Sequence, residues 1–417
     1  MILAGIVLII LTFVAIVKNY ETRLVLFLSG VIMCLIGGNV VAGLDAFIKE
    51  FTNTGLVPTI CTVLGFSYVM DYTNCSKHMV YLISSILKKC RIILIPGAVL
   101  VTFFINIALP SAAGCAAAVG VLLIPSLIYS GVHPAMAASA VFLGTWGSVM
   151  SPGLMFNPQI AQLAGTDVMT VIGTFSLQVI IAAIAAAGIL AVIAVVKKEN
   201  SGYVISAEEA KEEETFQLNY LYAVIPILPL VLLIISSKQL HLIPYLSVPV
   251  AMIIGTAIGF VVVRPNVKQA TKQFFKGVGD GMGDVVGLIA AAACFTTGMT
   301  VIGLTGALID VMRNSQQIAQ IVSGFGPFLI GALSGSGNAA ALAFNGAITP
   351  HAADFGYGII ELGSMAQIGA GLGRCMSPVA GAAIIIAKMA NVNPLELTKR
   401  NALPTIAATI IVMVLLL

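Results

Sequence analysis

Charged side chains are scarce in this sequence of 417 residues. Only 9% of the residues are Asp, Glu, Lys or Arg, whereas a soluble domain carries about 25%. With 59% hydrophobic residues and a mean hydropathy of +1.06, this composition excludes a water-soluble enzyme. It also excludes a disordered chain, which has few apolar residues. The 41 Gly and 17 Pro residues follow no triplet period, so a collagen-like fibre is excluded too.

Motifs of familiar enzyme chemistry are absent as well. The chain has no His-Glu-x-x-His or Gly-x-Ser-x-Gly motif and no His pair at ligand spacing, which argues against a metal-dependent or serine hydrolase. Its seven cysteines lie singly, so we expect neither disulfides nor a metal site. A net charge of +3 is too small for a nucleic-acid surface. We therefore expect no enzyme activity, no bound cofactor or metal, and no nucleic-acid partner.

One glycine-rich stretch, residues 277–284, superficially resembles a phosphate-binding loop. Such a loop follows a strand, and no strand is predicted before this stretch. We therefore interpret residues 277–284 as a flexible turn at a membrane edge.

Long apolar runs are abundant. A transmembrane helix needs about 20 apolar residues, so the chain has room for about ten crossings and for little outside the bilayer. The polar stretch near its centre predicts a first half at residues 1–197, a cytoplasmic linker at 198–218 and a second half at 219–417. The predicted apolar spans are 2–17, 24–43, 54–70, 92–109, 112–130, 134–164, 168–196, 220–237, 242–263, 284–309, 318–333, 338–349, 355–390 and 402–417.

The two halves repeat the same landmarks. Met150-Ser151-Pro152 recurs as Met376-Ser377-Pro378, 226 residues later. Pro125 matches Pro350, and residues 109–113 match residues 334–338, both at a spacing of 225. Three landmarks in one register predict an internal duplication.

Each half contains two apolar spans that are joined by only a few residues. The spans 92–109 and 112–130 form one such pair, and 318–333 and 338–349 form the other. Two full crossings cannot turn so tightly and also reach water, so each pair predicts a re-entrant hairpin. Each half then has five crossings plus one hairpin. Because five is odd, the second half enters from the opposite side, and the repeats are inverted.

The distribution of basic residues predicts the orientation. With the N-terminus outside, sixteen Lys and Arg residues lie in cytoplasmic segments and three lie on the outer face. Positive residues favour the cytoplasmic side. We therefore expect both termini on the outer, periplasmic side.

The Ser-Pro pairs at residues 151 and 377 predict interrupted helices. Ser is a good N-cap residue, and Pro is favoured at the first helical position, so each pair predicts a helix that restarts inside the membrane. The glycine-rich residues 144–147 and 369–373 predict an unwound backbone before each restart. We expect the hairpin tips to restart helices too, capped by Ser111 and by Ser336 with Asn338.

Four helix N-termini that meet at one depth would favour a small anion with two carboxylates. The alternative is that these prolines make ordinary kinks, which are common in transmembrane helices.

Ionisable residues within spans are usually functional. Arg374 precedes Ser377 and could bind a substrate carboxylate in a bidentate manner; alternatively, it forms a structural ion pair with Glu361. Asp354 and Glu361 are seven residues apart, hence on one helix face, with His351 one turn before Asp354. These three residues are candidates for proton coupling, or else interior pairing partners.

The hairpin at residues 104–114, the stretch at residues 334–345 and the paired Met-Ser-Pro breaks resemble the DcuC family of anaerobic C4-dicarboxylate carriers. This resemblance implies a bacterial inner-membrane protein with scaffold and transport domains, a homodimer and elevator movement. It also implies succinate, fumarate, malate or aspartate as substrate. Sodium-coupled relatives carry Ser-Asn-Thr at both hairpin tips, whereas the tips here read Ser111-Ala112-Ala113 and Ser336-Gly337-Asn338. Coupling to protons, or exchange, is therefore at least as plausible as coupling to sodium.

The sequence thus predicts an all-α membrane protein that carries a C4-dicarboxylate. The rival functions are a carrier of another organic anion, such as a sugar acid, or a sodium/proton exchanger. The predicted substrate-binding residues lie at the tips and breaks: Ser111, Ala112, Ser151, Asn157, Ser336, Gly337, Asn338, Arg374 and Ser377.

Overall fold

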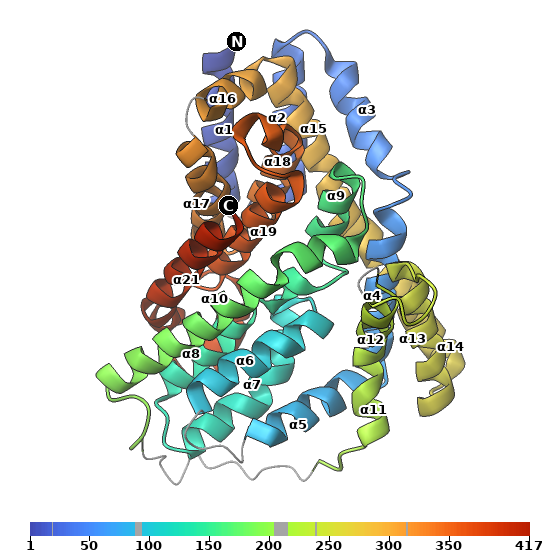
Figure 1. Ribbon diagram of the computed structural model, residues 1–417, viewed down its shortest axis with the longest axis vertical. Coiled ribbons are helices and arrows are strands. Elements are labelled where there is room, and N and C mark those ends of the chain that lie inside the picture. Colours follow the sequence, from blue (N-terminus) through green and yellow to red (C-terminus); the bar gives the residue numbers. More distant parts are fainter. Residues whose placement is uncertain (19, 88–93, 204–215, 238–239, 314–315) are drawn as a thin grey trace.

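The computed structural model describes residues 1–18, 20–87, 94–203, 216–237, 240–313 and 316–417. Within these residues the fold is helical and contains no strand, as the sequence predicts (Figure 1). In the described part of the chain, five helices are long and apolar enough to cross a membrane, and six shorter apolar helices accompany them. The chain is therefore an all-α protein with the composition of a multi-pass membrane protein.

Helices cover most of the predicted spans of the first half, but span 24–43 is interrupted at residues 37–39, and the helix Cys75–Leu87 lies outside every predicted span. The long final helix of this half, α10, occupies the whole predicted span 168–196. The helices are α1 (Ile2–Val17), α2 (Thr22–Ile36), α3 (Val40–Glu50), α4 (Val57–Tyr72), α5 (Cys75–Leu87), α6 (Leu94–Ala108), α7 (Ala112–Tyr129), α8 (Pro134–Gly144), α9 (Phe156–Leu163) and α10 (Val168–Val196).

The second half has a similar order. It comprises α11 (Tyr220–Val224), α12 (Leu228–Ile235), α13 (Val248–Val263), α14 (Val267–Asp280), α15 (Gly287–Val301), α16 (Leu304–Arg313), α17 (Gln316–Ser334), α18 (Asn338–Ala347), α19 (Ile359–Arg374), α20 (Gly381–Met389) and α21 (Pro394–Leu416). Short 3-10 helices lie at Ile225–Ile227 and Thr349–Phe355.

The prediction of a flexible turn at residues 277–284 is wrong. These residues are helical, and a π-helix at Gly281–Val286 joins α14 to α15 in one 35-residue helix, Val267–Val301. Close packing explains the glycine at 277, since a methyl group there would lie 2.4 Å from the Leu64 carbonyl oxygen. Glycine at this point thus serves helix packing, and the wider π-turn is a feature that often marks functional positions.

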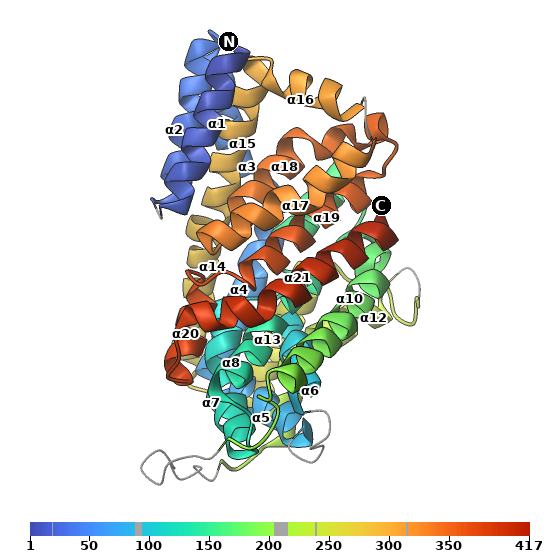
Figure 2. The same cartoon turned by 90° about the vertical axis from the view of Figure 1, so that its left-hand side faces the viewer.

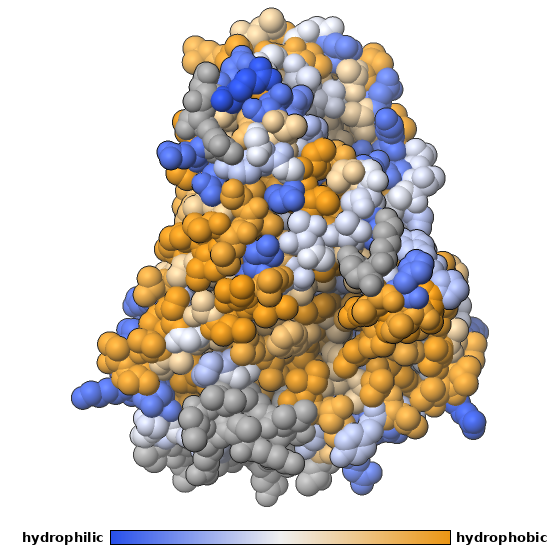
Figure 3. All heavy atoms as spheres, viewed as in Figure 1, coloured by the Kyte–Doolittle hydropathy of each residue, from blue (hydrophilic) through white to orange (hydrophobic). Residues whose placement is uncertain are grey.

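Apolar side chains cover much of the outer surface. Figure 3 shows hydrophobic residues spread over the middle and lower part of one face. Leu177, Val192 and Val195 of α10 are 61–66% exposed, and Val261 of α13 is 73% exposed. A water-soluble protein does not expose apolar residues on this scale. These helices are therefore suited to contact with lipid.

The two halves place like features at like positions. Gly131 and Gly356, 225 residues apart, both have positive φ angles, of 91° and 81°. Asp167 caps α10 and Asn393 caps α21 through a side-chain oxygen. The helices also pair in the same way across the halves. Helix α2 of the first half packs on α15 of the second, and α13 of the second half packs on α4 of the first. The long helices α10 and α21 lie side by side (Figure 2).

Candidate functional site

The first predicted break is confirmed. The helix α8 ends at Gly144, a short 3-10 helix η2 follows at Gly147–Met150, and α9 starts at Phe156. The predicted restart at Pro152 is wrong, because Ser151 is extended (φ −77°, ψ 130°) and the chain turns once more before α9. An extended conformation is what a following proline favours. Ser151 is buried, and its carbonyl oxygen accepts from Leu154 N.

The second break is confirmed at Ser377. The helix α19 ends at Arg374 and α20 starts at Gly381, so here too the restart comes after the Ser-Pro pair and not at Pro378. Ser377 is fully buried, and its hydroxyl has no hydrogen-bond partner among the residues that the structure describes. The helices thus restart four residues after Pro152 and three residues after Pro378.

The predicted unwinding at residues 369–373 is wrong, because these residues lie in α19. A methyl group at Gly369 would lie 2.1 Å from the Gly324 carbonyl oxygen, and one at Gly373 would lie 2.0 Å from that of Phe328. These glycines therefore let α19 approach the backbone of α17. In the first half, a methyl group at Gly147 would similarly lie 2.0 Å from the Phe103 carbonyl oxygen of α6.

The first hairpin tip is capped as predicted. Ser111 is the N-cap of α7, and its hydroxyl accepts from Gly114 N over 3.1 Å. Ala112 begins α7 and is half-buried. Asn106, which the sequence did not single out, ties this tip to the first break. Its amide donates to Leu109 O over 2.8 Å, and its oxygen accepts from Ser148 N over 2.7 Å.

The cap predicted for the second tip is wrong. The N-cap of α18 is Gly337, and Asn338 is the first helical residue, without a capping hydrogen bond. The tip turns through Gly335, whose φ is +75°. The Ser334 hydroxyl holds this turn, since it donates to Ser336 O over 2.8 Å and accepts from Ser336 N over 3.2 Å. The Ser336 side chain is left exposed at the tip.

The second tip packs directly onto its own break. A methyl group at Gly335 would lie 2.8 Å from Ala380, the last residue of the break, and one at Gly337 would lie 2.4 Å from Ala370 of α19. The hairpins approach from opposite ends of the molecule, α6–α7 at the bottom and α17–α18 toward the top of Figure 1. In each half, hairpin tip and break thus form one packed unit.

Arg374 joins the two breaks. Its guanidinium donates to Thr145 O, at the end of α8, over 2.6 Å, while its Nε is buried without a partner. Cys375 lies 3.5 Å from the Thr145 hydroxyl, and its carbonyl oxygen accepts from Asn401 of α21. The alternative pair with Glu361 is not observed, since thirteen helical residues separate the two by about 20 Å. Glu361 instead folds back over Gly358 at the start of α19.

Asn157 is fully buried and held in place. Its amide donates to Val149 O over 2.9 Å and to Ser151 O over 2.8 Å, and its oxygen accepts from Gln367 Nε2 over 2.7 Å. Asn157 therefore fixes the first break and connects it to α19. Gln367, the partner from the other half, was missed because nothing in the sequence indicates a contact over 210 residues.

Several buried polar atoms near the breaks have no partner within the described residues. Buried polar groups are usually hydrogen-bonded, so unpartnered atoms there favour binding of a polar ligand or water. The atoms in the breaks, or on side chains that contact them, are Gln367 Oε1, Ser377 Oγ, Asn401 Oδ1, Trp146 Nε1 and Arg374 Nε; Asn345 Nδ2 in α18 and Ser364 Oγ in α19 are further buried atoms without a partner among the described residues.

Two polar cavities adjoin the second hairpin. One, of about 360 Å³, is lined by Ser334 and Ser336 of the second tip and by Arg23, whose guanidinium pairs with Glu21 at 2.6 Å and with Asp284 at 2.9 Å. Burial acts to raise the pKa of Glu21, but the Leu24 N–H and the Arg23 guanidinium outweigh it and hold that pKa below its ordinary value.

The second polar cavity, of about 500 Å³, lies between α9, α18, α3 and α15. Lys49, Gln159 and Gln162 contribute polar groups to its wall. The second hairpin thus borders polar space on two sides, at its tip and along α18.

The three proton-coupling candidates do not share a helix face. Asp354 and His351 lie in the 3-10 helix that ends at Phe355, and Gly356 with φ +81° separates them from Glu361 in α19. Asp354 pairs with Arg313 at 3.1 Å and with His351 at 3.6 Å, and all three side chains are at least 38% exposed. This cluster therefore lies outside the buried region of the breaks.

A family model for C4-dicarboxylate anaerobic carriers matches residues 2–417. The chain belongs to the DcuC family. A DcuC carrier of Escherichia coli strain K12 is 26% identical to it over 99% of this chain and 95% of the carrier. An uncharacterized transporter of Haemophilus influenzae is 36% identical over 61% of this chain and 95% of that protein.

A solved structure of Neisseria gonorrhoeae MtrF, which belongs to a class of antimetabolite efflux pumps, is similar in fold, with a TM-score of 0.62 over 92% of this chain and 85% of MtrF. At 14% identity, this likeness concerns the fold alone. Membership of the DcuC family makes the protein a multi-pass inner-membrane carrier with a small carboxylate substrate, and not an enzyme.

Proposed function

We propose that this DcuC-family protein carries C4-dicarboxylates such as succinate, fumarate, malate and aspartate by alternating access. One observation carries the proposal: two interrupted helices from different halves meet through Arg374, beside buried polar atoms that lack partners. Such groups favour a polar ligand, and the free Nε of Arg374 can donate to a carboxylate.

The predicted site residues take different roles in this proposal. Arg374 and Ser377 contact the substrate, because each retains a buried polar atom without a partner. Ser111, Ala112, Ser336, Gly337 and Asn338 approach it from the two tips. Ser151 and Asn157 shape the first break, since the Asn157 side chain is already bonded to two carbonyl oxygens of the break and to Gln367.

We further propose that the halves are inverted repeats and that the hairpin and break segments move as a transport domain against a scaffold. Support comes from the matched glycines, the reciprocal pairing of α2 with α15 and of α13 with α4, and the hairpins at opposite ends. An inverted pair of this kind permits alternating access around one site. In this proposal both termini lie on the periplasmic side, and two copies form a dimer through the scaffold.

Coupling to a sodium ion or a proton also belongs to the proposal. His351 and Asp354 are exposed and paired with each other, and with Glu361 they are the groups proposed to carry a coupled proton. The two polar cavities beside the second tip and beside α9 are the access routes in this scheme.

Purified protein in liposomes tests the function. Labelled succinate is added outside and unlabelled fumarate is loaded inside, with sodium and proton gradients imposed separately. We expect saturable counterflow. The Arg374→Ala variant should lose at least about tenfold in uptake, since a hydrogen bond to a charged group contributes about 1.5–3 kcal/mol. Lys388→Ala, which removes an exposed basic residue of the same half, is the control. Unchanged uptake by Arg374→Ala would contradict the site.

A further inference from the structure

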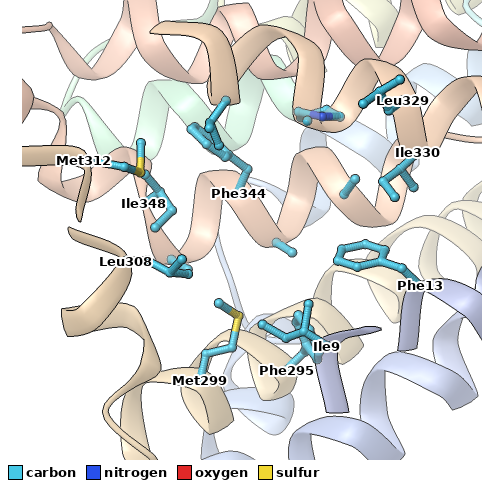
Figure 4. A pocket seen from close by; sticks show the side chains of 16 residues that line it. Ile9, Phe13, Phe295, Met299, Leu308, Met312, Leu329, Ile330, Phe344 and Ile348 are labelled. Atoms are coloured by element: carbon cyan, nitrogen blue, oxygen red, sulfur yellow. The ribbon is translucent and has the colours of Figure 1, made fainter. Parts of the chain in front are cut away.

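An apolar cavity separates the second hairpin from the helices around it. Its volume is about 410 Å³, and it lies between α17 and α18 on one side and α1, α15 and α16 on the other. All its lining side chains are apolar, with Gly326 and Pro327 completing the wall. Figure 4 shows Phe13, Met299, Leu308, Phe344 and other side chains pointing toward this space. Water gains no polar partner in such a cavity.

The cavity opens on an apolar outer surface. Leu308, Val322 and Leu329 belong to its lining and are 36%, 41% and 56% exposed. They form a rim beside α1, whose outward residues Leu3, Ile10 and Leu11 are also exposed. Since the protein is embedded in a membrane, lipid tails are the medium at this rim. The cavity volume of about 410 Å³ corresponds to about fourteen groups of the size of a water molecule, at about 30 Å³ each. This volume is large enough for much of one acyl chain.

Charged groups lie at one end of the cavity. Met312 and Ile348 form that end of the wall in Figure 4, and Arg313 and His351 follow them closely in the chain. Arg313 is 55% exposed and uses one nitrogen for Asp354, which leaves further N–H groups of its guanidinium free to donate. A phosphate is a favoured partner for such a group.

We propose that this cavity binds one acyl chain of a bilayer phospholipid, with the headgroup phosphate on Arg313. The acyl chain fills this cavity. If the cavity were empty, the side chains along its wall would lack dispersion contacts on that side. Because an acyl chain is flexible, α17–α18 can shift against α1, α15 and α16 without opening a void. The site is separate from the substrate site and does not depend on the proposed substrate.

Photolabelling in liposomes tests this proposal. The full-length protein is reconstituted with a phospholipid that carries a photoactivatable acyl chain, and labelled peptides are mapped. We expect label on peptides that contain Met299 and Met312. In Gly326→Leu that label should fall at least about fivefold, because the added side chain projects into the cavity, where a new Cβ has one neighbour, at 3.9 Å.

Gly188→Leu is the matched control. It adds the same side chain at an exposed helical glycine of α10 with no neighbour within 4 Å, and it should leave the cavity label unchanged. Label on the exposed residues Val192 and Val195 measures the contact of each variant with the membrane, and it should be the same in all variants. Ala343→Phe, which fills the cavity from α18, replaces Gly326→Leu if that variant does not elute as a single species.

Three results would overturn the proposal. The first is label at Met299 and Met312 that is equal in wild type and in the cavity-filling variants. The second is stronger labelling by a photoactivatable free fatty acid than by the phospholipid, which would identify another source of the chain. The third is cross-linking between two protomers at these residues, which would make the cavity part of a dimer interface. Arg313→Gln should lower the label at Met299 and Met312, because it removes the partner of the phosphate, and unchanged label would overturn the placement of the headgroup.

Discussion

Individual glycines serve two different purposes in this chain. Gly131 and Gly356 have positive φ angles, which other residues adopt only with strain. Gly369 and Gly373 are ordinary helical residues, and what they provide is the absence of a side chain against the backbone of α17. The sequence shows the residue type but not which purpose applies, and this is why residues 369–373 were expected to be unwound.

Gly369→Ala should destabilise the protein by about 1–3 kcal/mol, because its methyl group would lie 2.1 Å from the Gly324 carbonyl oxygen and force α17 and α19 apart. Gly381→Ala is the control, since no atom lies within 4 Å of a Cβ there. That variant should be neutral or more stable by about 0.4–1 kcal/mol. Thermal unfolding in detergent measures both. Equal melting temperatures for the two variants would contradict the packing role of Gly369.

Asn157 and Gln367 should be energetically coupled. Asn157→Ala leaves two buried carbonyl oxygens without their side-chain donor, and we expect a loss of about 2–4 kcal/mol. Gln367→Ala removes only the bond between the two side chains and should cost less. A double-mutant cycle on thermal stability should give a coupling of about 0.5–3 kcal/mol. Additive effects would show that the link between the break and α19 is not formed in the membrane protein.

At the scale of elements, the ends of α10 and α21 are joined by a buried arginine. Arg400 is 4% exposed and donates to Glu199 and Glu396, both at 2.8 Å. Removal of one partner from a buried ion pair costs about 3–5 kcal/mol, so Arg400→Met should lower stability by about that amount. Lys399→Met breaks a pair to Glu396 from a side chain that is 64% exposed, and should cost less than about 1 kcal/mol. Thermal unfolding of both variants is the measurement, and similar losses would contradict the role of burial.

The sequence predicts those elements whose ends are marked by a change of polarity. The spans 2–17 and 168–196 coincide with α1 and α10, because charged residues follow both apolar runs. The hairpins were predictable from the short spacing between apolar runs. The restart after Ser151 was placed too early, because the turn that delays it is held by the Asn157 side chain, which Gln367 of the other half keeps in place. The restart after Ser377 was placed too early as well. The role of Gln367 depends on a contact between the halves and has no local signal.

At the scale of the whole molecule, the proposed elevator movement carries α18, as part of the second hairpin, past α15, which is assigned to the scaffold in that proposal. A methyl group at Gly346 would lie 3.4 Å from Thr296 Cβ, close to the Cβ separation of about 3.5–4.5 Å in a disulfide. In a background without the other native cysteines, Gly346→Cys with Thr296→Cys should cross-link on oxidation. Succinate counterflow should then stop and return with a reductant.

A second disulfide within the proposed scaffold is the control for that experiment. A Cβ at Gly43 of α3 would lie 3.6 Å from Cys34 Cβ of α2, so Gly43→Cys should cross-link with the native Cys34 at a similar separation. Both helices pack against α15, and no movement between them is required. Counterflow should therefore persist when this pair is oxidised. If counterflow also persists with the Gly346 and Thr296 pair fully oxidised, α18 and α15 stay together during transport, and the moving boundary lies elsewhere.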